Sequence, residues 1–297
     1  MTICKVEAIP VSYQEPNDYN SLRSLCLVRI EDNSGYVGWG EAVTMWEEAT
    51  IATANIIKGM EDLLVKEDPE SNIEIISNLI DRVWWYGYKG GISGFAISAI
   101  DIALWDLKGK ILNKTVLDLI GGPVKDKLPV IASGHAHLES LDDLAQEAAT
   151  WVRNGIHGMK IGFGKKGDSN LGFDHERDVE YVKKVRQSIG SDKKFMIDLG
   201  WIIKWDVDTA IIRAKSFEEF GINWLEEPLG AWNPEGYKKL KNSTTIKMAY
   251  GEKEWDMRGY NQILETGTVD IVGFDPGRSQ GITGFLNLLK RIEELNI

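Results

Sequence analysis

Five ionisable side chains stand at the ends of short apolar runs in the second half of the sequence. They are Lys160, Asp198, Glu226, Glu252 and Asp275, in the runs HGMKIGF, KFMIDLG, NWLEEP, TIKMAYGE and VDIVGFD. Carboxylates brought together in this way repel one another unless positive charge lies among them. A hard divalent cation such as Mg²⁺ takes carboxylate, water and substrate oxygens as ligands. The pattern therefore indicates a metal site.

Each of these residues also has an ordinary interpretation. An acidic residue after a strand is often a helix N-cap or a solvated loop residue, but four in phase on successive runs favour the metal site. Lys160 could be a surface or salt-bridge residue. In a pocket shared with a metal it becomes a candidate general base, because burial and a neighbouring cation both favour the neutral amine.

The elements that must position these residues alternate along the chain. Apolar runs at residues 128–134, 157–163, 194–200, 223–228, 245–252 and 269–275 are separated by helical patterns such as SLDDLAQEAATWVRNG. This alternation predicts β/α units with a parallel sheet, either doubly wound or a (β/α)8 barrel. The barrel is favoured, because it brings the C-terminal ends of all strands to one mouth, whereas an open sheet would spread them along an edge.

The first part of the sequence has a different pattern of apolar and polar residues. Residues 1–12 and 24–39 read as strands with a hairpin at DNSG, and AISAIDIALWDLKGK reads as a helix with one apolar face. The Gly-, Pro- and Lys-rich stretch LIGGPVKDKLPV then predicts a junction. We expect an N-terminal α+β domain over residues 1–125 and a β/α domain over residues 126–297.

Composition limits the possible partners. The 297 residues are 43% hydrophobic, and the formal net charge is −11. This charge disfavours nucleic acid, and it disfavours small anionic substrates unless a metal supplies positive charge. Only two cysteines are present, and no apolar run is long enough to span a membrane. We expect a cytoplasmic location and no membrane partner.

These motifs together resemble the enolase superfamily, in its mandelate racemase and muconate lactonizing enzyme branch. The resemblance covers essentially the whole chain. It rests on GYVGWGEA, SAIDIALWDLKGK, LIGGPVKDKLPV, MKIG, FMIDLGW, WLEEP, YGE and DPGRSQGITG, in this order. It implies an α/β fold, a modified TIM barrel with an N-terminal α+β capping domain, and a reaction that begins with removal of the proton α to a carboxylate.

The resemblance also implies roles for individual residues. Asp198, Glu226 and Glu252 match the three Mg²⁺ ligands, and Lys160 matches the general base in the second position of a K-x-K motif. Asp275 matches an aspartate that pairs with a histidine from the following strand in the racemase branch. His135, Trp46 and Glu227 are candidate substrate-binding residues. Strand alternation points Glu227 away from Glu226, toward a neighbour of the site or the barrel wall.

The sequence departs from the family pattern in three places. Gly158 replaces the first lysine of K-x-K, and Ser279–Gln280 precedes Gly281 in the last motif. Residues 128–297 have room for only six β/α units, so the last two units and the expected histidine are missing. We expect the sequence to be part of a longer protein, the alternative being an inactive fragment.

The resulting functional hypothesis is a lyase, a Mg²⁺-dependent acid-sugar dehydratase acting on an aldonate or aldarate. The variants DLGW, WLEEPLG and DPGR favour this activity by analogy. The alternatives are a racemase or epimerase of a 2-hydroxy acid and a catalytically silent member of the family. We expect a homo-oligomer.

Overall fold

The computed structural model describes residues 1–16, 20–164, 167–230 and 232–295. The chain forms two compact units. The first unit holds residues 1–124, 252–262 and 274–297, and the second holds residues 125–251 and 263–273. Within the described residues, no helix is both long enough and apolar enough to cross a membrane.

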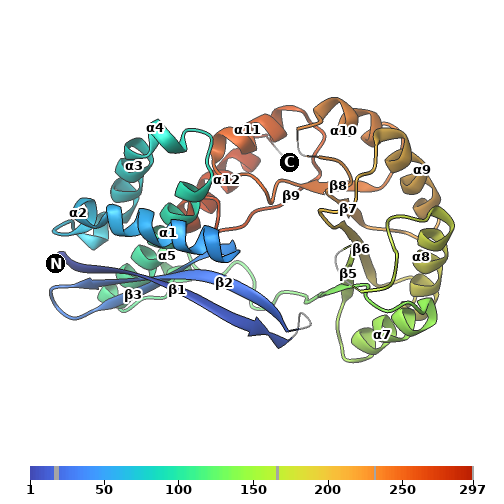
Figure 1. Ribbon diagram of the computed structural model, residues 1–297, viewed down its shortest axis with the longest axis horizontal. Helices are drawn as coiled ribbons and strands as arrows, with labels where there is room; N and C mark the ends of the chain where they lie inside the picture. Colours follow the sequence, from blue (N-terminus) through green and yellow to red (C-terminus); the bar gives the residue numbers. More distant parts are fainter. Residues whose placement is uncertain (17–19, 165–166, 231, 296–297) are drawn as a thin grey trace. The chain divides into compact units, whose positions relative to one another are not determined.

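The first unit begins with an antiparallel sheet in the order β1-β2-β3 (Figure 1). The predicted hairpin connects β2 and β3. Its turn is held by Asp32, whose Oδ1 accepts hydrogen bonds from the amides of Ser34 at 2.9 Å and Tyr36 at 2.8 Å. Burial alternates along β2 from Ser24 onward, as expected for a sheet with one covered face. The strands are β1 (Ile3–Glu15), β2 (Ser21–Asp32) and β3 (Val37–Met45).

Helix α5 (Ile92–Leu112) is the centre of this unit. The four apolar positions that predicted it, Ile97, Ile100, Leu104 and Leu107, are all buried. A Cβ at Gly40 would lie 2.0 Å from the carbonyl oxygen of Ala99, so this glycine lets β3 approach the helix backbone. The other helical elements are α1 (Glu47–Gly59), α2 (Glu61–Leu64), a 3-10 turn (Pro69–Ser71), α3 (Asn72–Arg82), α4 (Trp84–Gly87), α6 (Val116–Leu119) and α12 (Gly281–Leu295).

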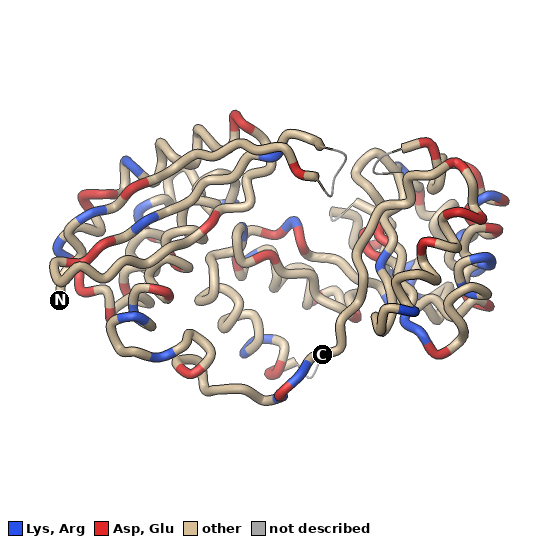
Figure 2. The backbone as a smooth tube through the Cα atoms, turned by 90° about the horizontal axis from the view of Figure 1, so that it is seen from below, with Lys and Arg blue, Asp and Glu red and all other residues tan. Residues whose placement is uncertain are grey.

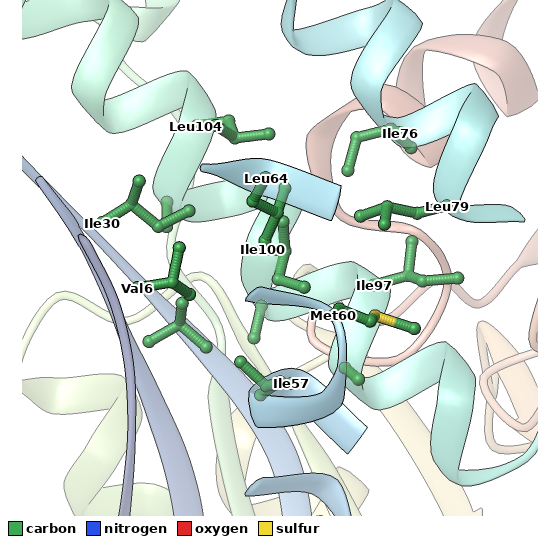
Figure 3. Close-up of a cluster of buried hydrophobic side chains, with 14 of the residues drawn as sticks. Val6, Ile30, Ile57, Met60, Leu64, Ile76, Leu79, Ile97, Ile100 and Leu104 are labelled. Atoms are coloured by element: carbon green, nitrogen blue, oxygen red, sulfur yellow. The ribbon is translucent and has the colours of Figure 1, made fainter. Parts of the chain in front are cut away.

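The core of the first unit lies between α5, the sheet and the helices α1 to α3. Figure 3 shows that side chains from the strands and the helices meet in one apolar cluster. Its members are fully or almost fully buried, so the hydrophobic effect holds these elements together. The labelled residues are Val6, Ile30, Ile57, Met60, Leu64, Ile76, Leu79, Ile97, Ile100 and Leu104.

The start of α12 is attached to α5, although the two are far apart in the sequence. Asp101 accepts hydrogen bonds from the amide of Thr283 at 3.0 Å and from its hydroxyl. The Ser98 hydroxyl accepts from the amide of Gln280 at 2.8 Å, and Trp105 donates to the Thr283 hydroxyl at 3.0 Å. Side chains of α5 therefore supply the N-terminal cap of α12.

The second unit is a parallel sheet of six strands in the order β4-β5-β6-β7-β8-β9 (Figure 1). Each strand pairs with the next strand in the chain, which is the order of a barrel; a doubly wound sheet changes direction at a switch point. The predicted barrel-type arrangement is confirmed. The strands are β4 (Ala132–His135), β5 (Gly158–Phe163), β6 (Lys194–Leu199), β7 (Trp224–Glu226), β8 (Lys247–Tyr250) and β9 (Ile271–Val272).

Helices cover one face of this sheet (Figure 1). They are α7 (Leu141–Arg153), α8 (His175–Ile189), α9 (Val207–Glu218) and α10 (Pro234–Lys241), while α11 (Met257–Glu265) precedes β9. Side-chain caps from Ser140, Asp174, Asp206 and Asn233 begin α7 to α10. Acidic and basic residues are interspersed along these helices (Figure 2). The sheet residues in register on the helix side, Ile161, Ile197, Leu225 and Met248, are all buried.

Candidate active site

One register row runs across all six strands of the second unit. It joins His135 to Gly162, Gly162 to Asp198, Asp198 to Glu226, Glu226 to Ala249 and Ala249 to Ile271. Residues in register on parallel strands direct their side chains to the same face. This is the face opposite the apolar row of Ile161, Ile197 and Leu225. Asp198 and Glu226 are therefore direct neighbours on the face that the helices do not cover.

Lys160 lies inside β5 rather than at its end, two residues before Gly162, and so points to the same face one step deeper. Its four-carbon stem reaches the row of carboxylates. The ammonium nitrogen lies 2.7 Å from Oε1 of Glu226 and 3.5 Å from Oδ2 of Asp198. The side chains are 22%, 16% and 11% exposed, so one positive and two negative charges meet in a partly desolvated site.

Trp224 is also part of this candidate site, although the sequence motifs did not indicate it. Its indole Nε1 donates to Oε2 of Glu226 at 3.3 Å, while Lys160 binds Oε1. Both carboxylate oxygens of Glu226 are thus held by separate donors. Trp224 and Glu226 are two positions apart on β7, so the alternation of strand side chains could have placed them on one face.

Glu227 has different surroundings from Glu226. It lies just beyond β7 with a φ of 47°, and its amide donates to the carbonyl of Ala249 at 2.9 Å. Its negative charge adds to burial in raising the pKa of Tyr237, a residue of α10. The Glu227 carboxylate therefore acts on Tyr237, whereas that of Glu226 contacts Lys160 and Trp224.

His135 ends β4 in the same row as Asp198, so it is on the face that carries the candidate site. Its carbonyl oxygen lies 3.0 Å from Nδ1 of His137. Trp46, by contrast, belongs to the first unit, where it stands at the start of α1 with 60% of its surface exposed.

Glu252 and Asp275 belong to the first unit, beyond the ends of β8 and β9. The Glu252 side chain is exposed, and its backbone carbonyl accepts a hydrogen bond from Arg278 at 3.2 Å. Oδ1 of Asp275 accepts from the amide of Gly277 at 2.8 Å. Burial raises the pKa of Asp275; that hydrogen bond and the charge of Arg278 oppose the rise, and the charge of Glu252 adds to it.

The fit of a metal ion can be judged from the donors in the second unit. Asp198 and Glu226 are adjacent hard-oxygen donors that already share one cation, the Lys160 ammonium. This donor set fits Mg²⁺. Across residues 1–16, 20–164, 167–230 and 232–295, no three His, Cys, Asp or Glu side chains form a group that could hold a metal. The two carboxylates of the second unit therefore fit a metal ion as a partial set of ligands.

The sequence matches one family over most of its length. Residues 17–121 match the N-terminal domain of mandelate racemase / muconate lactonizing enzyme, and residues 143–297 match the enolase C-terminal domain-like family. The chain belongs to the mandelate racemase and muconate lactonizing enzyme branch of the enolase superfamily, as the sequence motifs predicted.

Two curated relatives act on sugar acids or their lactones, as their names state. The D-galactarolactone cycloisomerase of Agrobacterium fabrum is 32% identical over 84% of this chain and 63% of its own length. The D-gluconate dehydratase of Thermoproteus tenax is 28% identical over 100% of this chain and 59% of its own length. The chain thus spans less than two thirds of either relative.

A solved structure gives the same fold. It is a racemase from Streptomyces coelicolor A3(2) with bound magnesium, with a TM-score of 0.85 and 27% identity over 99% of this chain and 82% of that chain. The fold of this family, with an N-terminal capping domain and a parallel α/β domain, is therefore the fold of this protein.

Proposed function

We propose that this chain carries the active site of a Mg²⁺-dependent acid-sugar dehydratase, a hydro-lyase of the enolase superfamily. The observation that carries the proposal is the placement of Lys160 against Asp198 and Glu226 on one face of the sheet. The dehydratase among the relatives supports the reaction class, and the names of both relatives support a sugar-acid substrate.

Three residues have the chemistry for the metal. Asp198 and Glu226 would hold Mg²⁺ from adjacent strands. Glu252, which follows β8, is the candidate third ligand because it matches that position in the sequence motifs of the family. When bound, Mg²⁺ would supply positive charge to the substrate carboxylate, whose α-proton is otherwise very weakly acidic. The charge would also offset the formal net charge of −11, which disfavours an anionic substrate.

Lys160 would act as the general base. Its neutral amine takes the α-proton of an aldonate or aldarate, the electron pair of that C–H bond forms a C=C bond, and the bond to the β-hydroxyl breaks. The hydroxyl leaves as water after it gains a proton, and the resulting enol becomes a 2-keto-3-deoxy acid. Asp275 is the candidate for the second acid–base group, and His135, Trp46 and Glu227 stay candidates for substrate contacts.

Isotope exchange tests this proposal. The protein loaded with Mg²⁺ is incubated in D₂O with a library of aldonates and aldarates. We expect deuterium at the α-carbon, or a 2-keto acid product lighter by one water, for at least one of them. EDTA should abolish both signals, and added Mg²⁺ should restore them. If no acid exchanges or loses water, the chain is not a dehydratase of these acids.

A sugar-acid cycloisomerase is the second candidate, because the 32% identical relative carries that activity in its name. A cycloisomerase gives a product of the same mass as the substrate, whereas dehydration removes one water. A racemase or epimerase also conserves mass but inverts the α-carbon, which optical rotation detects. A catalytically silent protein gives none of these results.

A further inference from the structure

Arg278 lies in the loop between β9 and α12 and is packed on two aromatic rings of its own unit. Its guanidinium carbon is 5.3 Å from the ring centre of Trp255 and 5.8 Å from that of Phe95. The two rings meet edge to face, with centroids 4.9 Å apart. A guanidinium over aromatic faces is attracted by their quadrupoles, so these contacts restrain the Arg278 side chain.

The aromatic support is itself fixed to the start of α5. A Cβ at Gly90 would lie 2.1 Å from the Cβ of Trp255, and a Cβ at Gly94 would lie 2.9 Å from its ring. A side chain at either position would collide with Trp255, so only glycine at these two positions permits the observed packing. Trp255 is thus packed closely against the start of α5.

Arg278 connects the segments that carry two candidate site residues. Its Nη1 donates to the backbone carbonyl of Glu252 at 3.2 Å, and its amide donates to the carbonyl of Asp275 at 3.0 Å. The next residue, Ser279, donates from its hydroxyl to the carbonyl of Glu254 at 2.6 Å. The positive charge of Arg278 also opposes the rise in the pKa of Asp275 that burial causes.

We propose that Arg278 is a positioning residue for Glu252 and Asp275. Its side chain holds the backbone carbonyl of Glu252, and its amide holds the loop of Asp275, against the start of α5. The inference rests on the proposed function, in which Glu252 is a Mg²⁺ ligand. Residues that orient metal ligands typically change metal affinity by about 10- to 100-fold when replaced.

The test measures Mg²⁺ binding by calorimetry, with MgCl₂ as the probe, alongside kcat and KM. Arg278→Met keeps the length of the side chain but removes its charge and donors, so we expect the Kd for Mg²⁺ to rise about 10-fold or more. We expect kcat to fall more than KM rises, because in this role Arg278 acts through the metal ligand Glu252 and not on the substrate. Arg278→Lys keeps the charge over the rings and should recover part of the affinity.

Arg258 provides the matched control. It lies in the same segment as Glu252, stacks over Tyr88 at 4.5 Å, and donates from Nε to Asp256 at 2.9 Å. Arg258→Met therefore removes an arginine with similar packing, and we expect it to lower thermal stability without changing the Kd for Mg²⁺. An equal loss of Mg²⁺ affinity in both variants would overturn the positioning role.

The outcomes separate this inference from the proposed function. If the wild-type protein acts on no sugar acid but Arg278→Met still weakens Mg²⁺ binding selectively, the proposed function is wrong and the inference stands. If the wild type is active and Arg278→Met binds Mg²⁺ normally, the inference is wrong and the proposed function stands. If the wild type binds no Mg²⁺, both are wrong.

Discussion

The Lys160 ammonium lies 2.7 Å from a carboxylate oxygen of Glu226, although the two residues come from strands that are not adjacent in the sheet. Strand β6 lies between them and contributes Asp198, whose carboxylate is 3.5 Å from the same ammonium. One ammonium and two carboxylates thus converge over three successive strands.

Replacing Lys160 should remove activity. In Lys160→Met no amine remains to take the α-proton, and we expect α-deuterium exchange to fall by about 10²- to 10⁴-fold. Lys241 offers a control, because its ammonium pairs with Asp270 at 2.9 Å in the same unit but away from the site row. Lys241→Met should exchange at the wild-type rate. Exchange retained in Lys160→Met would remove this residue from the mechanism.

Replacing Trp224 by Phe should weaken metal binding. The ring remains, but Glu226 loses the donor to its Oε2, and we expect Mg²⁺ affinity measured by calorimetry to fall by about 10-fold. Trp205→Phe is the control, because it loses an indole hydrogen bond of 2.7 Å to the carbonyl of Gly172, which is not part of the site. A normal Kd for Mg²⁺ in Trp224→Phe would show that this contact does not orient Glu226.

The buried ion pair Asp178–Arg213 should contribute strongly to stability. Its atoms lie 2.8 Å apart, the side chains are 0% and 8% exposed, and Asp178 also accepts from the amide of Gly172 at 2.7 Å. Asp178→Ala leaves the Arg213 charge buried without its partner, so we expect about 3–5 kcal/mol less unfolding free energy in urea titrations.

The control for this pair is an exposed ion pair of the same unit. Lys184 lies 2.5 Å from Asp142, whose side chain is 81% exposed. Solvent screens such pairs, so Asp142→Ala should leave the urea midpoint close to that of the wild type. Equal effects of the two substitutions would contradict the importance of burial.

Asp101 should make stability depend on pH. Burial raises its pKa from 3.8 to about 6, although Thr283 and Trp105 partly oppose this through hydrogen bonds. The folded state therefore binds this proton more tightly than the unfolded state. The resulting stabilisation is full below pH 3.8 and is lost as the pH rises through about 6.

Asp101→Asn tests this linkage. Asn keeps an oxygen acceptor for Thr283 but does not titrate. We expect the unfolding free energy of the wild type, relative to the variant, to decrease by about 2 kcal/mol from pH 4 to pH 7. Parallel curves for the wild type and Asp101→Asn would contradict the assigned pKa shift.

Much of the architecture could be predicted from local patterns. The alternation of apolar runs and helical periods located all six strands of the second unit, and the four apolar positions from Ile97 to Leu107 located α5. The sequence places Asp198 and Glu226 at the ends of consecutive strands. Because consecutive parallel strands end at one edge of the sheet, the two residues are predicted to be neighbours. The two residues are in register.

Other features depend on information that local patterns do not contain. Strands covered on both faces are apolar at nearly every position, so their pattern does not set the register that brings Lys160 to Glu226. The contact of Trp224 with Glu226 depends on side-chain direction within a three-residue strand. The attachment of Thr283 to Asp101 joins residues 182 positions apart, beyond the reach of any periodicity.

The cap that Asp101 and Ser98 provide for α12 has a consequence for synthesis of the chain. A ribosome makes α5 long before Gln280 and Thr283, so Asp101 gains its hydrogen-bond partner Thr283 only 182 residues later. Residues 125–251 of the second unit are made between the two parts of the first unit that this cap joins. We therefore expect residues 125–251 to begin folding during translation while α5 still lacks its contact with α12.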